Sequence, residues 1–107
     1  MLEALLGNKV IEKILLFLSV YGSGYPRQMS NVFDIPVNGI QQQLKRLENG
    51  SVVVSRKRGK VRIYSLNPAY PFLDELNQLL EKTIKLLPDN EVRKYYRKRT
   101  RPRRKGK

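Results

Sequence analysis

The sequence predicts a mainly α-helical domain that carries one small β-hairpin. Three observations lead to this prediction. Apolar residues recur at helical spacing in several segments, two β-branched runs flank a short basic turn, and 107 residues suit one compact domain.

The first expected helix begins at Asn8, a favourable N-cap residue, and runs to about Tyr21. Its apolar face is wider than one small core needs, because Leu16 and Phe17 extend the stripe, and this surplus predicts a subunit interface. Gly22-Ser23-Gly24 then ends the helix.

A short second helix is expected from Pro26 to about Phe33, with Met29 and either Val32 or Phe33 turned inward. Asp34 follows in a turn, where Asp tolerates a left-handed backbone. A third helix from Val37 to about Asn49 follows this turn. Ile40, Leu44 and Leu47 lie on one face of it, and Asn49-Gly50 is expected to end it. Two short helices joined by a tight turn are the helix-turn-helix pattern.

A β-hairpin is expected next. Val52-Val53-Val54 and Val61-Arg62-Ile63-Tyr64 are rich in β-branched and aromatic residues, and Lys57-Arg58-Gly59-Lys60 is the expected turn between them. A fourth helix from Pro71 to about Leu87 carries leucines at three-and-four spacing, and Thr83 interrupts this seam. We expect it to dock on the first helix or on a second subunit, so the prediction is a homodimer through the first and fourth helices.

The positive charge is concentrated at the C-terminal end. The chain has a net charge of +13, and residues 1–88 carry 12 basic and 7 acidic side chains, whereas residues 89–107 carry 10 basic and 2 acidic ones. We therefore expect residues 1–88 to form the domain and 89–107 a basic, flexible tail. Alternatively, Tyr95 and Tyr96 stack on RNA bases or pack on the fourth helix.

Composition excludes several classes of function. The chain has neither cysteine nor histidine, which removes thiolate zinc sites, disulfides and the commonest general base. The nine carboxylates are scattered, so we expect no enzyme, no metal and no cofactor. The apolar run Ile14–Leu18 is too short for a membrane span of roughly 20 residues. The expected location is the cytoplasm, in association with the nucleoid.

Particular residues strengthen the pattern. They are Ile40, Gln42, Leu44, Arg46, Leu47 and Glu48 in the third helix, Gly59 and Tyr64 in the hairpin, and Asn67-Pro68, Pro71, Glu75-Leu76, Leu79 and Lys82 beyond it. In these residues the segment Gly7 to Leu87 resembles winged helix-turn-helix transcription regulators of the ArsR and MarR type. It is most similar to the group found alone or fused to minimal nucleotidyltransferases. The resemblance implies a three-helix core, a β-wing and a long C-terminal helix.

Three positions depart from the family pattern. The family usually has Gly where Asp34 stands and a capping Ser or Thr where Pro36 stands. Its helix-ending Gly lies one place after Gly50. Metal-regulated repression is not implied, because the chain lacks the Cys and His clusters of the metal sensors. A nucleotidyltransferase partner is implied only weakly.

Two basic or amide-rich segments are the candidate DNA-binding residues. On the third helix the outward residues are Asn38, Gly39, Gln41, Gln42, Gln43, Lys45 and Arg46. The alternative for Gln43 is that it points sideways from this face. On the hairpin they are Arg56, Lys57, Arg58, Lys60 and Arg62. Gln and Asn can bond the edge of adenine in two places, and a glycine lets the backbone approach closely. Basic side chains neutralise phosphates. The alternatives are that the glutamines only solvate a helix and that the hairpin charges only protect its edge.

The function expected from these residues is sequence-specific binding of double-stranded DNA by a transcription regulator. The third helix would lie in the major groove, with the hairpin and tail on the backbone or in the minor groove. Two alternatives stay open. One is a non-specific DNA-coating or RNA-binding protein driven by the tail, and the other is an antitoxin-like module that binds a protein.

Overall fold

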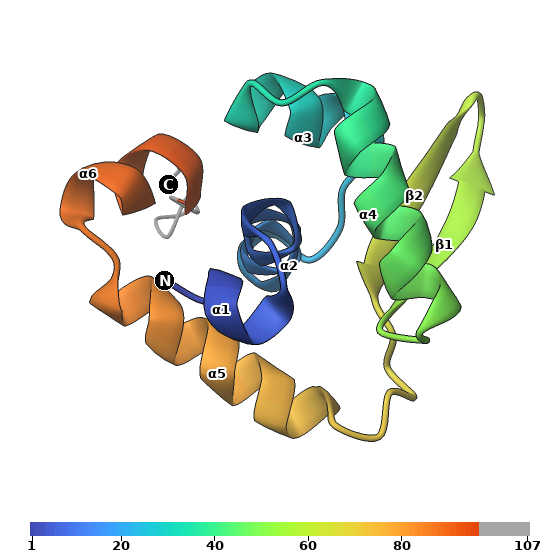
Figure 1. The fold of residues 1–107 in the computed structure, drawn as a ribbon. Helices are drawn as coiled ribbons and strands as arrows, with labels where there is room; N and C mark the ends of the chain where they lie inside the picture. The colour runs from blue at the N-terminus through green and yellow to red at the C-terminus, as the bar shows by residue number, and fades with distance from the viewer. Residues whose placement is uncertain (97–107) are drawn as a thin grey trace, which may run out of the picture.

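Helix α2 (Lys9–Tyr21) lies at the centre of the fold, and the other elements are arranged around it (Figure 1). The computed structural model describes residues 1–96. The elements other than α2 are α1 (Glu3–Leu6), α3 (Pro26–Phe33), α4 (Val37–Asn49), β1 (Val53–Arg58), β2 (Val61–Leu66), α5 (Leu73–Leu86), α6 (Asp89–Glu91) and the π-helical turn η1 (Val92–Tyr96). The predicted class, mainly α with a small β-hairpin, is confirmed.

Helix α2 begins and ends where the sequence predicts. The Asn8 side chain accepts a hydrogen bond from the backbone N–H of Ile11 over 2.7 Å, and Gly22 ends the helix with a φ of 87°. Leu16 and Phe17 are buried, and α1, α3, α5 and η1 all pack against this helix. The Phe17 ring lies 6.0 Å from that of Phe33 in α3. The chain itself thus covers the wide apolar stripe from which a subunit interface was predicted, and the homodimer stays a prediction.

Helices α3 and α4 form the expected helix-turn-helix. Asp34 adopts the left-handed conformation with a φ of 56°, and the Ser30 hydroxyl donates to the carbonyl of Ile35 over 2.5 Å. Of the two alternatives for the inward side of α3, Phe33 is buried and Val32 is exposed. At the end of α4 the left-handed residue is Ser51, with a φ of 65°, and Gly50 keeps an ordinary φ of −86°.

The hairpin is longer than predicted and its turn is tighter. Arg58 pairs with Val61, so the turn consists of Gly59 and Lys60 alone, with Gly59 at a φ of 63°. Lys57 and Arg58, which were expected in the turn, belong to β1. The hairpin also pairs with the segment between α2 and α3, because Gly24 and Tyr64 exchange backbone hydrogen bonds of 3.0 and 2.8 Å.

Helix α5 packs on α2. Of the two predicted alternatives, docking on the first helix or on a second subunit, the structure shows the first. Leu80 and Leu87 are buried. Thr83, which was expected to interrupt the leucine seam, is buried within it, and its hydroxyl donates to the carbonyl of Leu79 over 2.7 Å. A hydroxyl that bonds its own helix in this way can be buried without leaving a polar group unsatisfied.

Residues 89–96, which were expected to belong to a flexible tail, fold onto the domain. Tyr96 is buried, and the rings of Tyr95 and Tyr96 lie 5.2 and 5.9 Å from the ring of Phe33 in α3. Aromatic packing of this kind outweighs the high local charge. The tyrosines thus pack against α3 and α2, and stacking on RNA bases stays a prediction. The remainder of the predicted tail, residues 97–107, lies outside the described residues.

Candidate nucleic-acid interface

Helix α4 separates its side chains into a buried face and an exposed face. Ile40 and Leu44 are fully buried, and Leu47 is 8% exposed. The opposite side carries the exposed residues Asn38, Gln41, Gln42, Lys45 and Arg46. This division follows directly from the 3.6-residue period of the helix. The amide side chains predicted to read bases therefore reach solvent on one side of α4.

Gln43 differs from its two glutamine neighbours. It is half-buried, and its side-chain oxygen accepts a hydrogen bond from the Asn8 side chain over 3.2 Å. The same Asn8 caps α2 through its oxygen. Gln43 thus links the start of α2 to α4, and the structure does not group it with Gln41 and Gln42 on the exposed surface.

Gly39 lies in the first half of α4 and is half-buried. A Cβ built at this position would meet only Cγ2 of Ile35, at 3.5 Å, which is an ordinary van der Waals distance. The fold therefore does not require glycine here. Glycine in a helix is less favourable than alanine by about 0.8–1 kcal/mol, so the packing of the chain gives no reason for this residue.

Arg46 lies where α4 borders a cavity that Leu76 of α5 also lines. It is exposed, and it also lines a cavity of about 240 Å³ together with Leu47, Val52, Tyr70 and Leu76. The long aliphatic part of an arginine side chain can cover apolar surface while its guanidinium stays in water. Arg46 therefore borders both the exposed face of α4 and this largely apolar cavity.

The five basic residues of the hairpin are all exposed, but they lie on two faces. Lys57 and Arg62 are directly opposite each other, on the face that also carries the buried Tyr64. Arg56 and Arg58 lie on the other face, because side chains alternate along a strand. Lys60 is in the turn. The basic residues, which are close together in the sequence, are thus distributed over both faces and the turn of the hairpin.

A polar chain of three residues joins α4 to the hairpin. The Ser55 hydroxyl donates to a carboxylate oxygen of Glu48 over 2.6 Å, and it accepts a hydrogen bond from the Arg62 guanidinium over 3.1 Å. Burial raises the pKa of Tyr64 beneath this chain; Glu48 adds to the increase and Arg62 opposes it. The roles of Glu48 and Ser55 were missed in the sequence, although strand alternation puts Ser55 on the inner face with Val53.

Helix α4 and the hairpin lie side by side at one side of the molecule, with α3 at the start of α4 (Figure 1). Within residues 1–96, no group of three or more Asp or Glu side chains could hold a metal ion. The described part of the chain also has no helix long and apolar enough to cross a membrane.

No protein-family model matches the chain, and no curated protein matches it in sequence. Among solved structures, a mutant of Lactococcus lactis ZitR in its apo form is similar in fold, with a TM-score of 0.54 and 19% sequence identity. The similar region covers 78% of this chain and 71% of that one. At this identity the likeness shows the fold alone, and it confirms the winged-helix architecture predicted from the sequence.

Proposed function

We propose that this protein is a sequence-specific regulator of transcription that binds double-stranded DNA. One observation carries the proposal: α4 buries Ile40 and Leu44 against the domain and exposes a row of amide side chains beside a basic hairpin. A single α-helix fits the major groove, where each base pair has a distinct pattern of donors and acceptors. The winged-helix fold is consistent with this mode of binding.

The residues have different roles in the proposal. Asn38, Gln41 and Gln42 contact base edges, and Gly39 allows the backbone of α4 to approach the groove. Lys45, Arg46 and the five basic residues of the hairpin contact phosphates or the minor groove and set the position on the duplex. Gln43 acts within the protein, through its bond to Asn8.

The proposal includes a homodimer that binds two half-sites about one helical turn apart. Helix α5 and the residue before it support the proposed dimer. Phe72, Leu79 and Leu86 follow one another at seven-residue intervals. Phe72 and Leu86 are 62% and 59% exposed, and Leu79 is half-buried. Large exposed apolar side chains in a row mark candidate interfaces. The proposed contact therefore uses α5 and not α2. The proposed function requires neither catalysis nor a cofactor. The protein would act on chromosomal DNA in the cytoplasm.

A second candidate is non-specific binding of DNA or RNA driven by the C-terminal basic residues. It is favoured by the composition of residues 97–107, which include 8 Lys and Arg and no acid. Such a segment would attract any nucleic acid through its charge, without reading its sequence. A nucleotidyltransferase or another protein as the partner remains a prediction from the resemblance alone.

Selection of bound duplexes from a random pool tests these proposals, using the full chain and a chain that ends at Tyr96. A regulator selects a palindromic consensus with both chains, and the shorter chain binds it more weakly. Loss of nearly all binding in the shorter chain would show that the tail drives binding. A pool without a consensus for either chain would overturn the proposed function.

A further inference from the structure

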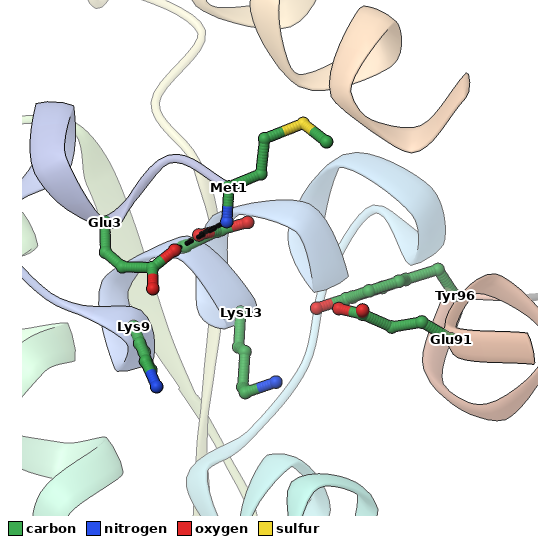
Figure 2. Close-up of a pocket in the computed structure, with 7 residues that line it drawn as sticks. Met1, Glu3, Lys9, Lys13, Glu91 and Tyr96 are labelled. Carbon is green, nitrogen blue, oxygen red and sulfur yellow. Dashed lines mark hydrogen bonds and ion pairs between the residues drawn. The ribbon is translucent and has the colours of Figure 1, made fainter. Parts of the chain in front are cut away.

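A cavity of about 220 Å³ lies between the N-terminal segment, α2 and the C-terminal segment α6–η1. Figure 2 shows residues that line it, and they include Glu3, Glu12, Glu91, Lys9, Lys13 and Tyr96. Three of the nine acidic residues of a chain with net charge +13 therefore lie around one cavity. One water molecule needs only about 10–15 Å³ of such space, so the cavity is large enough for several.

Tyr96 gives the first indication of a ligand. The side chain is 2% exposed, and its hydroxyl has no hydrogen-bond partner within residues 1–96. Tyr96 and Glu91 come from the same C-terminal segment and line the same cavity (Figure 2). A buried hydroxyl without a partner is rare in proteins, because it loses its bonds to water. The cavity in front of it can hold a group that restores such a bond.

Glu12 gives the second indication. Its side chain is 8% exposed, and one of its carboxylate oxygens accepts hydrogen bonds from the backbone N–H of Leu2 over 2.8 Å and the amino group of Met1 over 3.2 Å. No hydrogen bond to its other oxygen is found among residues 1–96. A buried carboxylate needs cationic or donor partners to remain charged. The second oxygen of this nearly buried carboxylate can therefore accept a hydrogen bond from a ligand.

The two lysines of the cavity do not neutralise Glu91. The Lys13 ammonium lies 5.5 Å from the centre of the Phe33 ring and 4.9 Å from that of Tyr95, so it is held over aromatic faces. The ammonium ends of Lys9 and Lys13 both point away from Met1 (Figure 2). Within the described residues, Glu91 forms no ion pair. Its carboxylate and the Tyr96 hydroxyl are therefore available to a ligand.

We propose that this cavity binds a small organic ammonium ion that carries a second polar group, such as an amino alcohol. Glu12 and Glu91 accept hydrogen bonds from the ammonium, and the Tyr96 hydroxyl bonds the second polar group. Carboxylates favour the ammonium through charge, and a hydroxyl partner adds the orientation that a charge alone lacks. The inference does not depend on DNA binding, and it can be tested without DNA.

The test is titration of the full chain with ethanolamine hydrochloride, followed by the amide signals in two-dimensional NMR spectra. Ethanolamine should shift signals of residues near 12, 91 and 96 in a saturable way, with a Kd of about 1 mM or tighter. Tyr96→Phe should weaken binding roughly two- to tenfold, the range expected for one hydrogen bond. Glu91→Gln, in a half-buried residue whose side chain forms no ion pair within residues 1–96, should weaken it by about tenfold or more. Glu81→Gln, in an exposed residue of α5 outside the cavity, is the matched control and should leave the Kd unchanged.

Two further titrations separate the ligand from general effects of salt and from anions. Sodium chloride at equal ionic strength and sodium acetate should not cause the same saturable shifts. The proposal is overturned if ethanolamine shifts follow those of sodium chloride, which would mean that the cavity holds water only. It is also overturned if acetate binds at these residues, or if Glu91→Gln and Tyr96→Phe leave the Kd for ethanolamine unchanged.

Discussion

Ser55 in β1 donates its hydroxyl hydrogen bond to Glu48 near the end of α4, over 2.6 Å. The bond connects the helix proposed to read bases with the hairpin proposed to hold the backbone. The same hydroxyl accepts from Arg62, one of the candidate phosphate contacts. The relative position of the two halves of the candidate interface therefore depends in part on a single serine side chain.

The first prediction concerns this bond. Ser55→Ala combined with Glu48→Ala should show a coupling free energy of about 0.5–1 kcal/mol, because a bond at an exposed site contributes less than a buried one. Urea unfolding of the wild-type chain, both single variants and the double variant measures the coupling. Ser55→Ala combined with Asn49→Ala is the control, and its effects should be additive. A coupling of zero in the first cycle would show that the bond does not hold the hairpin to α4.

The second prediction concerns the residue that ends α4. Ser51 has a left-handed backbone, and the N–H groups of Val52 and Ser51 bond the carbonyls of Leu47 and Glu48 over 2.9 and 3.0 Å. A non-glycine residue in this conformation costs about 1–2 kcal/mol. Ser51→Gly should therefore raise the free energy of unfolding by about 1 kcal/mol, as measured by chemical denaturation.

Gly50→Ala is the matched variant for this position. Gly50 has a negative φ, and an added Cβ would meet atoms at 3.6 Å or more. Alanine restricts the unfolded chain more than glycine does, so this change should be neutral or stabilising by up to about 1 kcal/mol. If Ser51→Gly and Gly50→Ala both destabilise the protein, the left-handed residue is Gly50 and not Ser51.

The third prediction concerns Gly24, which pairs with Tyr64 of the hairpin. A Cβ at this position would lie 2.6 Å from the Phe17 ring and 3.1 Å from the Met29 side chain. Both of these neighbours are buried, so neither can move freely. Gly24→Ala should lower the free energy of unfolding by about 1–3 kcal/mol. Thermal unfolding measures the loss, and Ser23→Ala, in the exposed neighbour, should stay within about 0.5 kcal/mol of wild type.

Much of the helical framework could be predicted from the sequence because local signals determine it. Asn8 caps α2, Pro26 begins α3, and Asp34 forms the left-handed turn, as expected. The hairpin was predicted less well, since its register depends on the pairing of Arg58 with Val61, which composition does not reveal.

The errors arise where packing between distant segments decides the outcome. A helix covered by its own chain and a helix covered by a second subunit have the same wide apolar stripe, so Leu16 and Phe17 could not distinguish them. The tyrosines at 95 and 96 stand in a basic segment, and only their contact with Phe33 shows that they belong to the core. Gln43 has the same side chain as Gln41 and Gln42, and its bond to Asn8 is a tertiary contact.

The fourth prediction uses this difference between adjacent glutamines and depends on the proposed function. Gln42→Ala should reduce discrimination at the selected DNA site by about 1–3 kcal/mol, and it should leave stability within about 0.5 kcal/mol of wild type. Gln43→Ala should instead lower stability by about 0.5–1.5 kcal/mol, because Asn8 loses a partner, with little change in sequence preference. Binding assays on matched and mismatched duplexes, together with denaturation, measure both quantities. Equal effects of the two variants on discrimination would contradict the assignment of Gln42 to base contact.

The fifth prediction concerns Gly39, where the requirements of folding and of DNA binding oppose each other. The added Cβ fits, and alanine is the better helix former, so Gly39→Ala should raise the free energy of unfolding by about 0.5–1 kcal/mol. If the backbone of α4 approaches the groove at this position, the same methyl group should weaken DNA binding. Because the variant is more stable, a loss of affinity could not be explained by unfolding. Unchanged or tighter binding would show that the start of α4 does not lie against the DNA.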